Sequence, residues 1–75
     1  MEKKLSEMKY NEEGVVKRIE ETLRIKVAGM GIRTGKKIKM ITKHPLKGPV
    51  VVLVDESRTS LALSIADKIF VEVSK

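Results

Sequence analysis

Apolar residues in this chain occur only in short runs, and the longest is the five-residue segment Val50–Val54. Glycine or proline separates these runs at Gly14, Gly31 and Gly35 and within the segment 45–49. A helix that crosses a membrane needs about 20 consecutive apolar residues, so no such helix is expected. Short apolar runs between turn residues instead predict a protein built mainly of short strands.

Two segments carry the strand pattern most clearly. Between residues 36 and 42, Ile38 and Met40 alternate with lysines, which is the period-two pattern of a strand with one buried face. The segment Val50–Val54 is apolar on both faces and rich in β-branched valine. Three further strands are predicted, over roughly 15–20, 59–63 and 69–73.

One short helix and one helical turn are expected between the strands. The helix follows the first strand, and its apolar face repeats at helical spacing: Leu23, Val27 and Met30. Thr22 is a candidate N-cap for it. The helical turn is predicted over 64–67, before the last strand, with Ser64 as its cap.

Two glycines are expected in backbone conformations that other residues tolerate poorly. Gly31 follows the predicted helix and suits the left-handed position that ends it. Gly35 lies in the next turn, where a positive φ is expected. With 75 residues there is room for a single domain, 1–75, and the elements fit a small barrel or sandwich.

The net charge of +6 is concentrated in the middle of the chain. Residues 24–47 contain eight basic and no acidic side chains: Arg24, Lys26, Arg33, Lys36, Lys37, Lys39, Lys43 and Lys47. Such a segment can face nucleic acid, anionic lipid or an acidic protein, or it can be a solvated surface that keeps a small domain in solution. Tyr10 and Phe70 both lie outside it, so it contains no aromatic residue for base stacking.

The sequence offers little material for catalysis or metal binding. It contains no cysteine, one histidine and one tyrosine, so an enzyme is not expected. The candidate metal ligands have no ligand-like spacing: His44, Asp55, Glu56, Asp67 and Glu72. We therefore predict no catalytic residues, no intrinsic iron site and no cofactor.

A series of short motifs runs in order from Leu5 to Val73: Leu5-Ser-Glu-Met8, Gly14-Val-Val-Lys-Arg-Ile19, Met30-Gly31-Ile32, Gly35-Lys-Lys-Ile38-Lys-Met40, Pro45-Leu-Lys-Gly-Pro49-Val-Val-Val52, Leu61-Ala-Leu-Ser64 and Ala66-Asp-Lys-Ile69-Phe-Val71. This order resembles the ferrous iron transport protein A (FeoA) family, whose domain is similar to the C-terminal domain of diphtheria-toxin-repressor-type metal regulators. The resemblance implies a mainly β fold, a small SH3-like five-stranded barrel. It also implies a cytosolic accessory role beside the membrane GTPase that moves ferrous iron.

Some apolar side chains of the predicted sheet should point away from the barrel: Ile41, Val51, Leu53 and Phe70. The short helix or the N-terminal segment could cover them, or they could form a patch for a protein partner with Lys37 and Lys39 at its rim. The leading hypothesis is an adaptor in the cytoplasm that docks on the cytosolic portion of a ferrous iron transporter GTPase, at the inner face of the membrane. The alternative is a small basic barrel that binds nucleic acid through residues 24–47.

Overall fold

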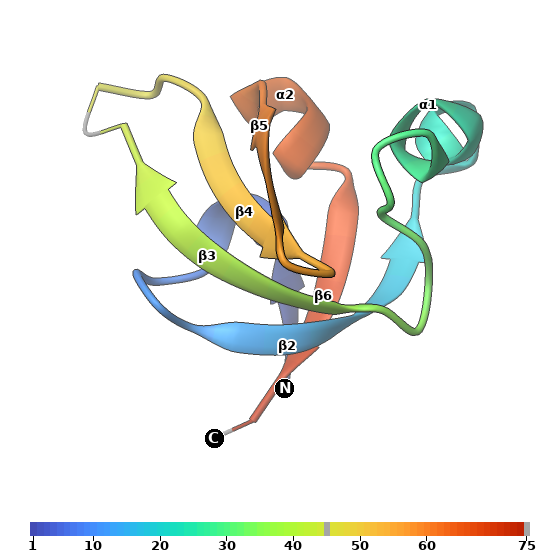
Figure 1. The fold of residues 1–75 in the computed structure, drawn as a ribbon, viewed down its shortest axis with the longest axis horizontal. Helices are drawn as coiled ribbons and strands as arrows, with labels where there is room; N and C mark the ends of the chain where they lie inside the picture. Colours follow the sequence, from blue (N-terminus) through green and yellow to red (C-terminus); the bar gives the residue numbers. More distant parts are fainter. Residues whose placement is uncertain (45, 75) are drawn as a thin grey trace.

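The computed structural model describes residues 1–44 and 46–74, and within them one antiparallel sheet of six strands curls around the core in the order β1-β6-β2-β3-β4-β5 (Figure 1). The strands are β1 Glu2–Lys4, β2 Glu13–Ile19, β3 Lys37–Lys43, β4 Val50–Val54, β5 Ser57–Leu61 and β6 Ile69–Val73. The helical elements are the 3-10 turns η1 Leu5–Glu7 and η2 Glu21–Leu23 and the short helices α1 Arg24–Ala28 and α2 Leu63–Ala66. The predicted mainly β, SH3-like fold is confirmed, with one strand more than the predicted five.

The additional strand is β1, which pairs with β6 so that Glu2 lies opposite Glu72 and Lys4 opposite Phe70. The N-terminal ammonium extends this pairing, because it donates a hydrogen bond to the carbonyl oxygen of Val73 at 3.0 Å. Three polar residues have no strand preference of their own. The segment is therefore ordered by a partner strand at the other end of the chain, which local sequence cannot reveal.

The turn between β4 and β5 is shorter than predicted. Asp55 and Glu56 have φ values of 51° and 66°, so two residues in left-handed conformations reverse the chain. The fifth strand consequently begins at Ser57 and ends at Leu61, so the strand predicted over 59–63 is present but lies two residues earlier in the chain. Leu63 instead begins α2, whose N-cap is Ala62 rather than the predicted Ser64.

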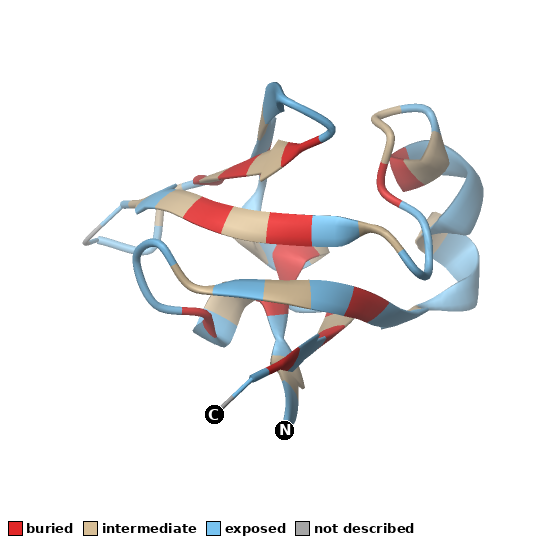
Figure 2. Ribbon diagram, turned by 60° about the horizontal axis from the view of Figure 1, so that its bottom comes forward, coloured by how far each residue is buried: buried red, intermediate tan, exposed pale blue. Residues whose placement is uncertain are grey.

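The core combines alternate residues of the strands with side chains from the helical segments. Its members are almost completely buried: Leu5, Met8, Val16, Val27, Ile32, Ile38, Met40, Val50, Val52, Val54, Leu61, Ala66, Ile69, Val71 and Val73. Figure 2 shows the resulting alternation along β3, where the two predicted inward residues, Ile38 and Met40, are buried. Leu5 and Met8 bring the segment before β2 into this core, so that segment does not cover the outside of the sheet.

Helix α1 lies at one end of the molecule, beside the chain that leads into β3 (Figure 1). Val27 is buried, and Leu23 and Met30 pack against the core, so the predicted apolar face is confirmed. Thr22 lies inside η2 rather than at a cap. Gly31 and Gly35 have the expected positive φ, 86° and 91°. None of the helices in residues 1–44 and 46–74 is long and apolar enough to span a bilayer.

Candidate functional site

Three of the predicted outward residues come together on β3 and β4. Leu53 lies between Lys39 and Arg58 across the sheet, and Val51 is paired with Thr42. Ile41 is the extra residue of a bulge, since the register passes from Met40 directly to Thr42. We call these residues the outward face: Lys37, Lys39, Ile41, Val51 and Leu53. Its apolar members are half-buried, and Val51 and Leu53 have polar cross-strand neighbours, so each exposes only part of its side chain.

Phe70 does not belong to the outward face. It lies on β6, opposite Arg18 and Lys4, and strands β2 and β3 separate it from β4. The guanidinium of Arg18 covers the Phe70 ring, 4.2 Å from its centroid, and also pairs with Glu2 at 2.7 Å. A cation over an aromatic face is itself favourable, so this ring already has a partner within the chain.

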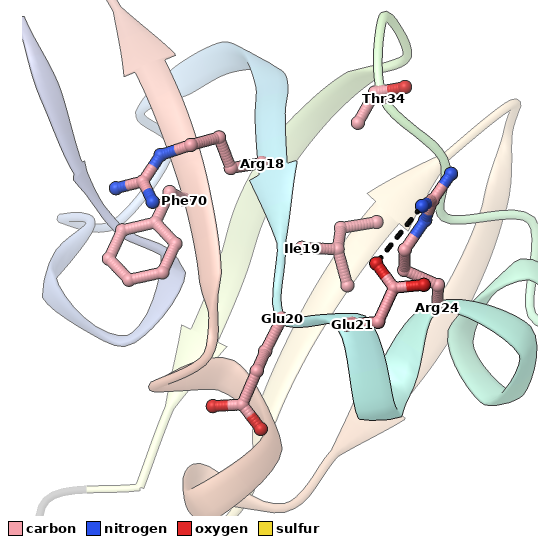
Figure 3. Close-up of a pocket in the computed structure, with 7 residues that line it drawn as sticks. All are labelled: Arg18, Ile19, Glu20, Glu21, Arg24, Thr34 and Phe70. Carbon is pink, nitrogen blue, oxygen red and sulfur yellow. Dashed lines mark hydrogen bonds and ion pairs between the residues drawn. The ribbon is translucent and has the colours of Figure 1, made fainter.

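The structure instead shows a hollow beside α1 that sequence reasoning missed. It measures about 520 Å³ and is lined by Arg18, Ile19, Glu20, Glu21, Arg24, Thr34 and Phe70 (Figure 3). A second hollow of about 510 Å³ continues it along the helix and adds Ile25, Ala28, Ile32 and Arg33. We call the two together the α1 groove. In Figure 3, Ile19 lies at its centre, between Arg18 on one side and Arg24 on the other.

The carboxylates of the α1 groove have hydrogen-bond or ion-pair partners within the protein, whereas one of its guanidinium groups, that of Arg33, has no ion-pair partner among the described residues. Glu21 pairs with Arg24 at 3.2 Å, the contact dashed in Figure 3. Glu20 accepts the hydroxyl of Thr22 at 2.7 Å and lies 3.8 Å from the Lys68 ammonium. No ion pair within residues 1–44 and 46–74 involves Arg33. The groove can therefore accept an acidic group at its rim.

Ile25 is the most exposed large apolar residue within residues 1–44 and 46–74, with 91% of its surface accessible. It projects from α1 on the side away from Val27, because the short helix turns only one face to the core. A sequence signal for it did exist: Ile25 is an apolar residue off the stripe formed by Leu23, Val27 and Met30. Its neighbour Ala28 is small and leaves the groove open beside it.

The candidate metal ligands lie apart, and each described one has a different environment. Asp55 pairs with Lys36 at 2.7 Å, and Asp67 accepts the hydroxyl of Ser6. The N-terminal ammonium binds Glu72 and lowers the pKa of that carboxyl. His44 Nδ1 accepts the main-chain N–H of Leu46. Within residues 1–44 and 46–74, no group of three or more metal-ligating side chains comes together.

The basic segment 24–47 does not form one patch, because the fold distributes it over the length of the molecule. Arg24, Lys26 and Arg33 lie at the α1 end. Lys36, Lys37 and Lys39 lie along β3 or just before it. Lys43 and Lys47 lie at the loop that follows β3. Tyr10 lies beside the last group, since its hydroxyl donates to the carbonyl oxygen of Lys43 at 3.0 Å. The basic segment thus has an aromatic neighbour that its own sequence lacks.

Comparison with known proteins places this fold in a family. A family model described as the FeoA domain matches residues 3–73. No curated protein matches the chain in sequence. A solved structure described as iron uptake regulatory protein (FeoA) is 30% identical, with a TM-score of 0.89 and 99% of each chain covered. The NMR structure of a FeoA-like protein from Clostridium acetobutylicum is also 30% identical, with a TM-score of 0.86 and coverage of 99% of this chain and 88% of that one.

The same fold occurs inside a larger regulator. A manganese-dependent transcriptional repressor is 20% identical, with a TM-score of 0.88, and the match covers 97% of this chain but 42% of the repressor. At this identity the likeness shows the fold alone. Together with the family match, it confirms the resemblance carried by the ordered motifs.

Proposed function

This chain belongs to the FeoA domain family, and on that basis we propose that it is an accessory protein that docks on the cytosolic portion of a ferrous iron transporter of the GTPase type. Membership of the family implies a part in ferrous iron transport. The partner and the contact surface are what the proposal adds. Docking of this kind would hold the protein at the inner face of the membrane through its partner.

The observation that supports docking most directly is Ile25. Ile25 is 91% exposed on helix α1 and lines the second hollow, so an aliphatic side chain and a groove lie side by side on the same surface. Side chains that fill pockets at the centre of an interface account for most of its binding energy. In this arrangement Ile25 enters the partner while the partner's own apolar residue enters the α1 groove, and Arg33 meets a carboxylate at the rim.

The mechanism we infer is a shift between conformational states of the transporter. A bound protein changes the ratio of two states only by the ratio of its affinities for them. A tenfold change therefore requires a difference of about 1.4 kcal/mol in binding free energy. One or two side chains that contact a segment present in a single state suffice for this, so an adaptor needs no reactive group.

We expect the affinity to be moderate. Apolar area removed from water contributes about 25 cal/mol per Å², and association itself costs about 4–15 kcal/mol. The contact would consist of Ile25 and a groove whose two hollows measure about 520 and 510 Å³. Such a contact is small, so a dissociation constant on the order of micromolar is expected. Such an affinity suits an accessory protein that associates and dissociates.

Calorimetric titration of the purified protein into the transporter's cytosolic domain, in each nucleotide state, tests the proposal. We expect Ile25→Asp to weaken binding by about tenfold or more, because it would place a carboxylate in a desolvated contact. Leu46→Asp is the matched control, since Leu46 is 82% exposed at the other end of the molecule. Absence of binding by the wild-type protein, to this domain and to the full-length transporter in membranes, would refute the function.

The same titration separates the α1 groove from the outward face. If the outward face is the contact, Val51→Asp and Leu53→Asp abolish binding and Ile25→Asp does not. Both residues are half-buried, so circular dichroism must first show that these variants fold. Lys37→Glu with Lys39→Glu would then mainly slow association, since rim charges act on the encounter more than on the bound state.

A further inference from the structure

The end of the molecule opposite α1 consists of two neighbouring segments, the turn that precedes β2 and the loop that follows β3 (Figures 1 and 2). Main-chain hydrogen bonds join the turn to strand β3, including one from the N–H of Asn11 to the carbonyl oxygen of Met40 at 2.7 Å, and the Tyr10 hydroxyl bonds to Lys43 at the end of that strand, where the loop begins. We refer to six described side chains of these segments as the Leu46 end: Lys9, Tyr10, Lys43, His44, Leu46 and Lys47. Neither the core nor the proposed docking surface uses them.

Leu46 is 82% exposed, and its main chain is held by the neighbouring His44. The ring of His44 lies against Gly48 so closely that an added Cβ there would be 2.5 Å from the ring's Cγ atom. The same ring holds the main chain, because its Nδ1 accepts the N–H of Leu46 at 3.1 Å. The imidazole of His44 therefore lies against Gly48, and the Leu46 side chain extends into solvent.

Tyr10 adds an exposed ring at the same end. Its surface is 60% accessible, and its hydroxyl donates to the carbonyl oxygen of Lys43 at 3.0 Å. The polar tip therefore has a partner within the chain, while the ring remains in water. Tyrosine placed in this way, with one wet end and one apolar body, is typical of side chains at the boundary between a bilayer and water.

Three lysines belong to the same end of the molecule, Lys9 and Lys43 beside Tyr10 and Lys47 next to Leu46 in the chain. No carboxylate of residues 1–44 and 46–74 lies within ion-pair distance of the ammonium of Lys9, Lys43 or Lys47. The nearby carboxylate of Glu12 is already bound by the Lys3 ammonium at 3.2 Å and by the main-chain N–H of Lys9 at 2.9 Å. Glu13, at the start of β2, is exposed and without an ion-pair partner among the described residues, so three lysines face one free carboxylate and the Leu46 end keeps a local excess of positive charge.

We propose that the Leu46 end binds the surface of a bilayer that contains anionic phospholipid. Leu46 inserts between the headgroups, the Tyr10 ring lies at their level, and the three lysines face the lipid phosphates. Each lysine near such a surface strengthens binding by about fivefold, and the effect fades within a Debye length. With one inserted aliphatic residue and few charges, binding is weak and reversible.

A lipid surface fits this end better than nucleic acid or a shaped protein partner does. Tyr10 has no second aromatic residue beside it, because Phe70 lies under Arg18 on another part of the sheet, so a stacking platform is missing. A phosphate backbone also gives the exposed Leu46 side chain no contact. An isolated exposed aliphatic side chain on an end that also carries three lysines suits an anionic lipid surface, which is soft and adapts its shape to an inserted side chain.

The position of the Leu46 end gives the proposal a consequence for the whole protein. The loop after β3 and helix α1 lie at opposite ends of the molecule in both views (Figures 1 and 2). A protein lying on lipid through Leu46 therefore leaves the α1 groove free. The inference goes beyond the proposed docking and does not depend on it, since lipid alone would be the partner.

Co-sedimentation with vesicles tests the inference in the absence of any transporter. We expect the protein to bind vesicles of about 30 mol% phosphatidylglycerol in phosphatidylcholine and not vesicles of phosphatidylcholine alone. Raising the NaCl concentration from about 0.1 to 0.5 M should weaken binding strongly, because the charges lie outside the bilayer core. Leu46→Ser should weaken binding by about tenfold, as expected when one aliphatic side chain no longer inserts.

Matched variants at the opposite end control for composition and net charge. Ile25→Ser removes an aliphatic residue that is even more exposed than Leu46, 91% against 82%, and should leave lipid binding unchanged. Lys43→Glu with Lys47→Glu, and Lys26→Glu with Arg33→Glu, both lower the net charge from +6 to +2, since each substitution removes two charges. Only the pair at the Leu46 end, Lys43→Glu with Lys47→Glu, should abolish lipid binding.

Three outcomes would overturn the inference. Leu46→Ser could bind like the wild type, which would exclude insertion. Both charge pairs could lose binding equally, which would mean attraction by net charge alone. A single-stranded oligonucleotide could bind more tightly than the vesicles, with the same dependence on Lys43 and Lys47 but none on Leu46, which would assign this end to nucleic acid. Because none of these assays contains the transporter, their failure leaves the test of the proposed function intact.

Discussion

Gly14 and Gly35 are both needed as glycine, but for different physical reasons, and the two predict different costs of substitution. An added Cβ at Gly14 would lie 2.5 Å from the carbonyl oxygen of Glu72 and 2.5 Å from Val71 Cγ1. At Gly35 nothing lies within 4 Å, and the constraint is a φ of 91°. The first alanine must therefore push two strands apart, whereas the second only strains its own backbone.

We expect Gly14→Ala to lower the free energy of unfolding by about 2–3 kcal/mol and Gly35→Ala by about 1 kcal/mol, measured by urea denaturation. Gly29→Ala is the control. Gly29 has a helical φ of −64°, and its Cβ would be 3.4 Å from the Lys26 carbonyl oxygen, so alanine there should be neutral or slightly stabilising. Equal midpoints for Gly14→Ala and Gly35→Ala would contradict the close approach of β6 to β2.

Glu12 makes stability depend on pH at the residue scale. Its carboxylate accepts the main-chain N–H of Lys9 and pairs with the Lys3 ammonium, and these contacts hold the pKa of Glu12 below its ordinary value of 4.5. The unfolded chain therefore takes up this proton at a higher pH than the folded one. The stabilisation is complete above about pH 5 and is lost as the pH falls through the lowered pKa.

We expect Glu12→Gln to be less stable than the wild type near neutral pH, and the difference to shrink as the pH falls from about 5 to 3. Thermal unfolding of both proteins at several pH values measures this. Glu13→Gln serves as the control, because Glu13 is exposed and makes no side-chain hydrogen bond or ion pair within residues 1–44 and 46–74. A constant difference between Glu12→Gln and the wild type across this range would show that the contacts of Glu12 contribute nothing to the pH dependence.

At the scale of elements, the turn between β4 and β5 is built from residues that fit it poorly. Asp55 and Glu56 both have positive φ, a geometry that favours asparagine at the first position and glycine at the second. Glu56→Gly should therefore raise the free energy of unfolding by about 1 kcal/mol. Asp55→Gly should gain less, because it also removes the ion pair with Lys36. A lower denaturation midpoint for Glu56→Gly would contradict the assigned turn.

Elements that alternate apolar and polar residues over several positions could be predicted from the sequence, and those fixed by distant partners could not. The bounds of β4 and β6 could be predicted, because β-branched valine and isoleucine residues begin and end both strands. By contrast, β1 has three polar residues, and only its pairing with β6 makes it a strand. The alternation places both Phe70 and Val51 on the outside of the sheet, yet strands β2 and β3 lie between them, and this strand order depends on which strands meet in space.

The α1 groove is a second feature that could not be predicted from the sequence. Its two hollows are lined by the end of β2, helix α1 and the segment before β3, which approach one another only in the folded chain. The sequence contains a hint in Ile25, an apolar residue off the buried stripe of its helix. An apolar residue outside the local buried pattern was thus the one sequence feature that pointed to the exposed side of this helix.

At the scale of the whole molecule, the two proposed surfaces would reinforce each other. A protein that docks through the α1 groove while the Leu46 end lies on lipid binds twice, and the second contact forms at a high effective concentration. A lipid contact that is weak alone can then add substantially to the affinity. The reinforcement exists only if the docked protein reaches the bilayer with its opposite end.

We therefore expect the protein to bind the full-length transporter about tenfold more tightly in membranes with anionic phospholipid than in neutral ones. Titration against transporter in nanodiscs of each composition measures this ratio. Leu46→Ser should reduce the ratio to about one without changing the affinity in neutral nanodiscs, because only the lipid contact is lost. Ile25→Asp should weaken binding in both compositions, since it removes the contact that brings the protein to the surface. Equal wild-type affinities in the two membranes would mean that the docked protein holds its Leu46 end away from the bilayer.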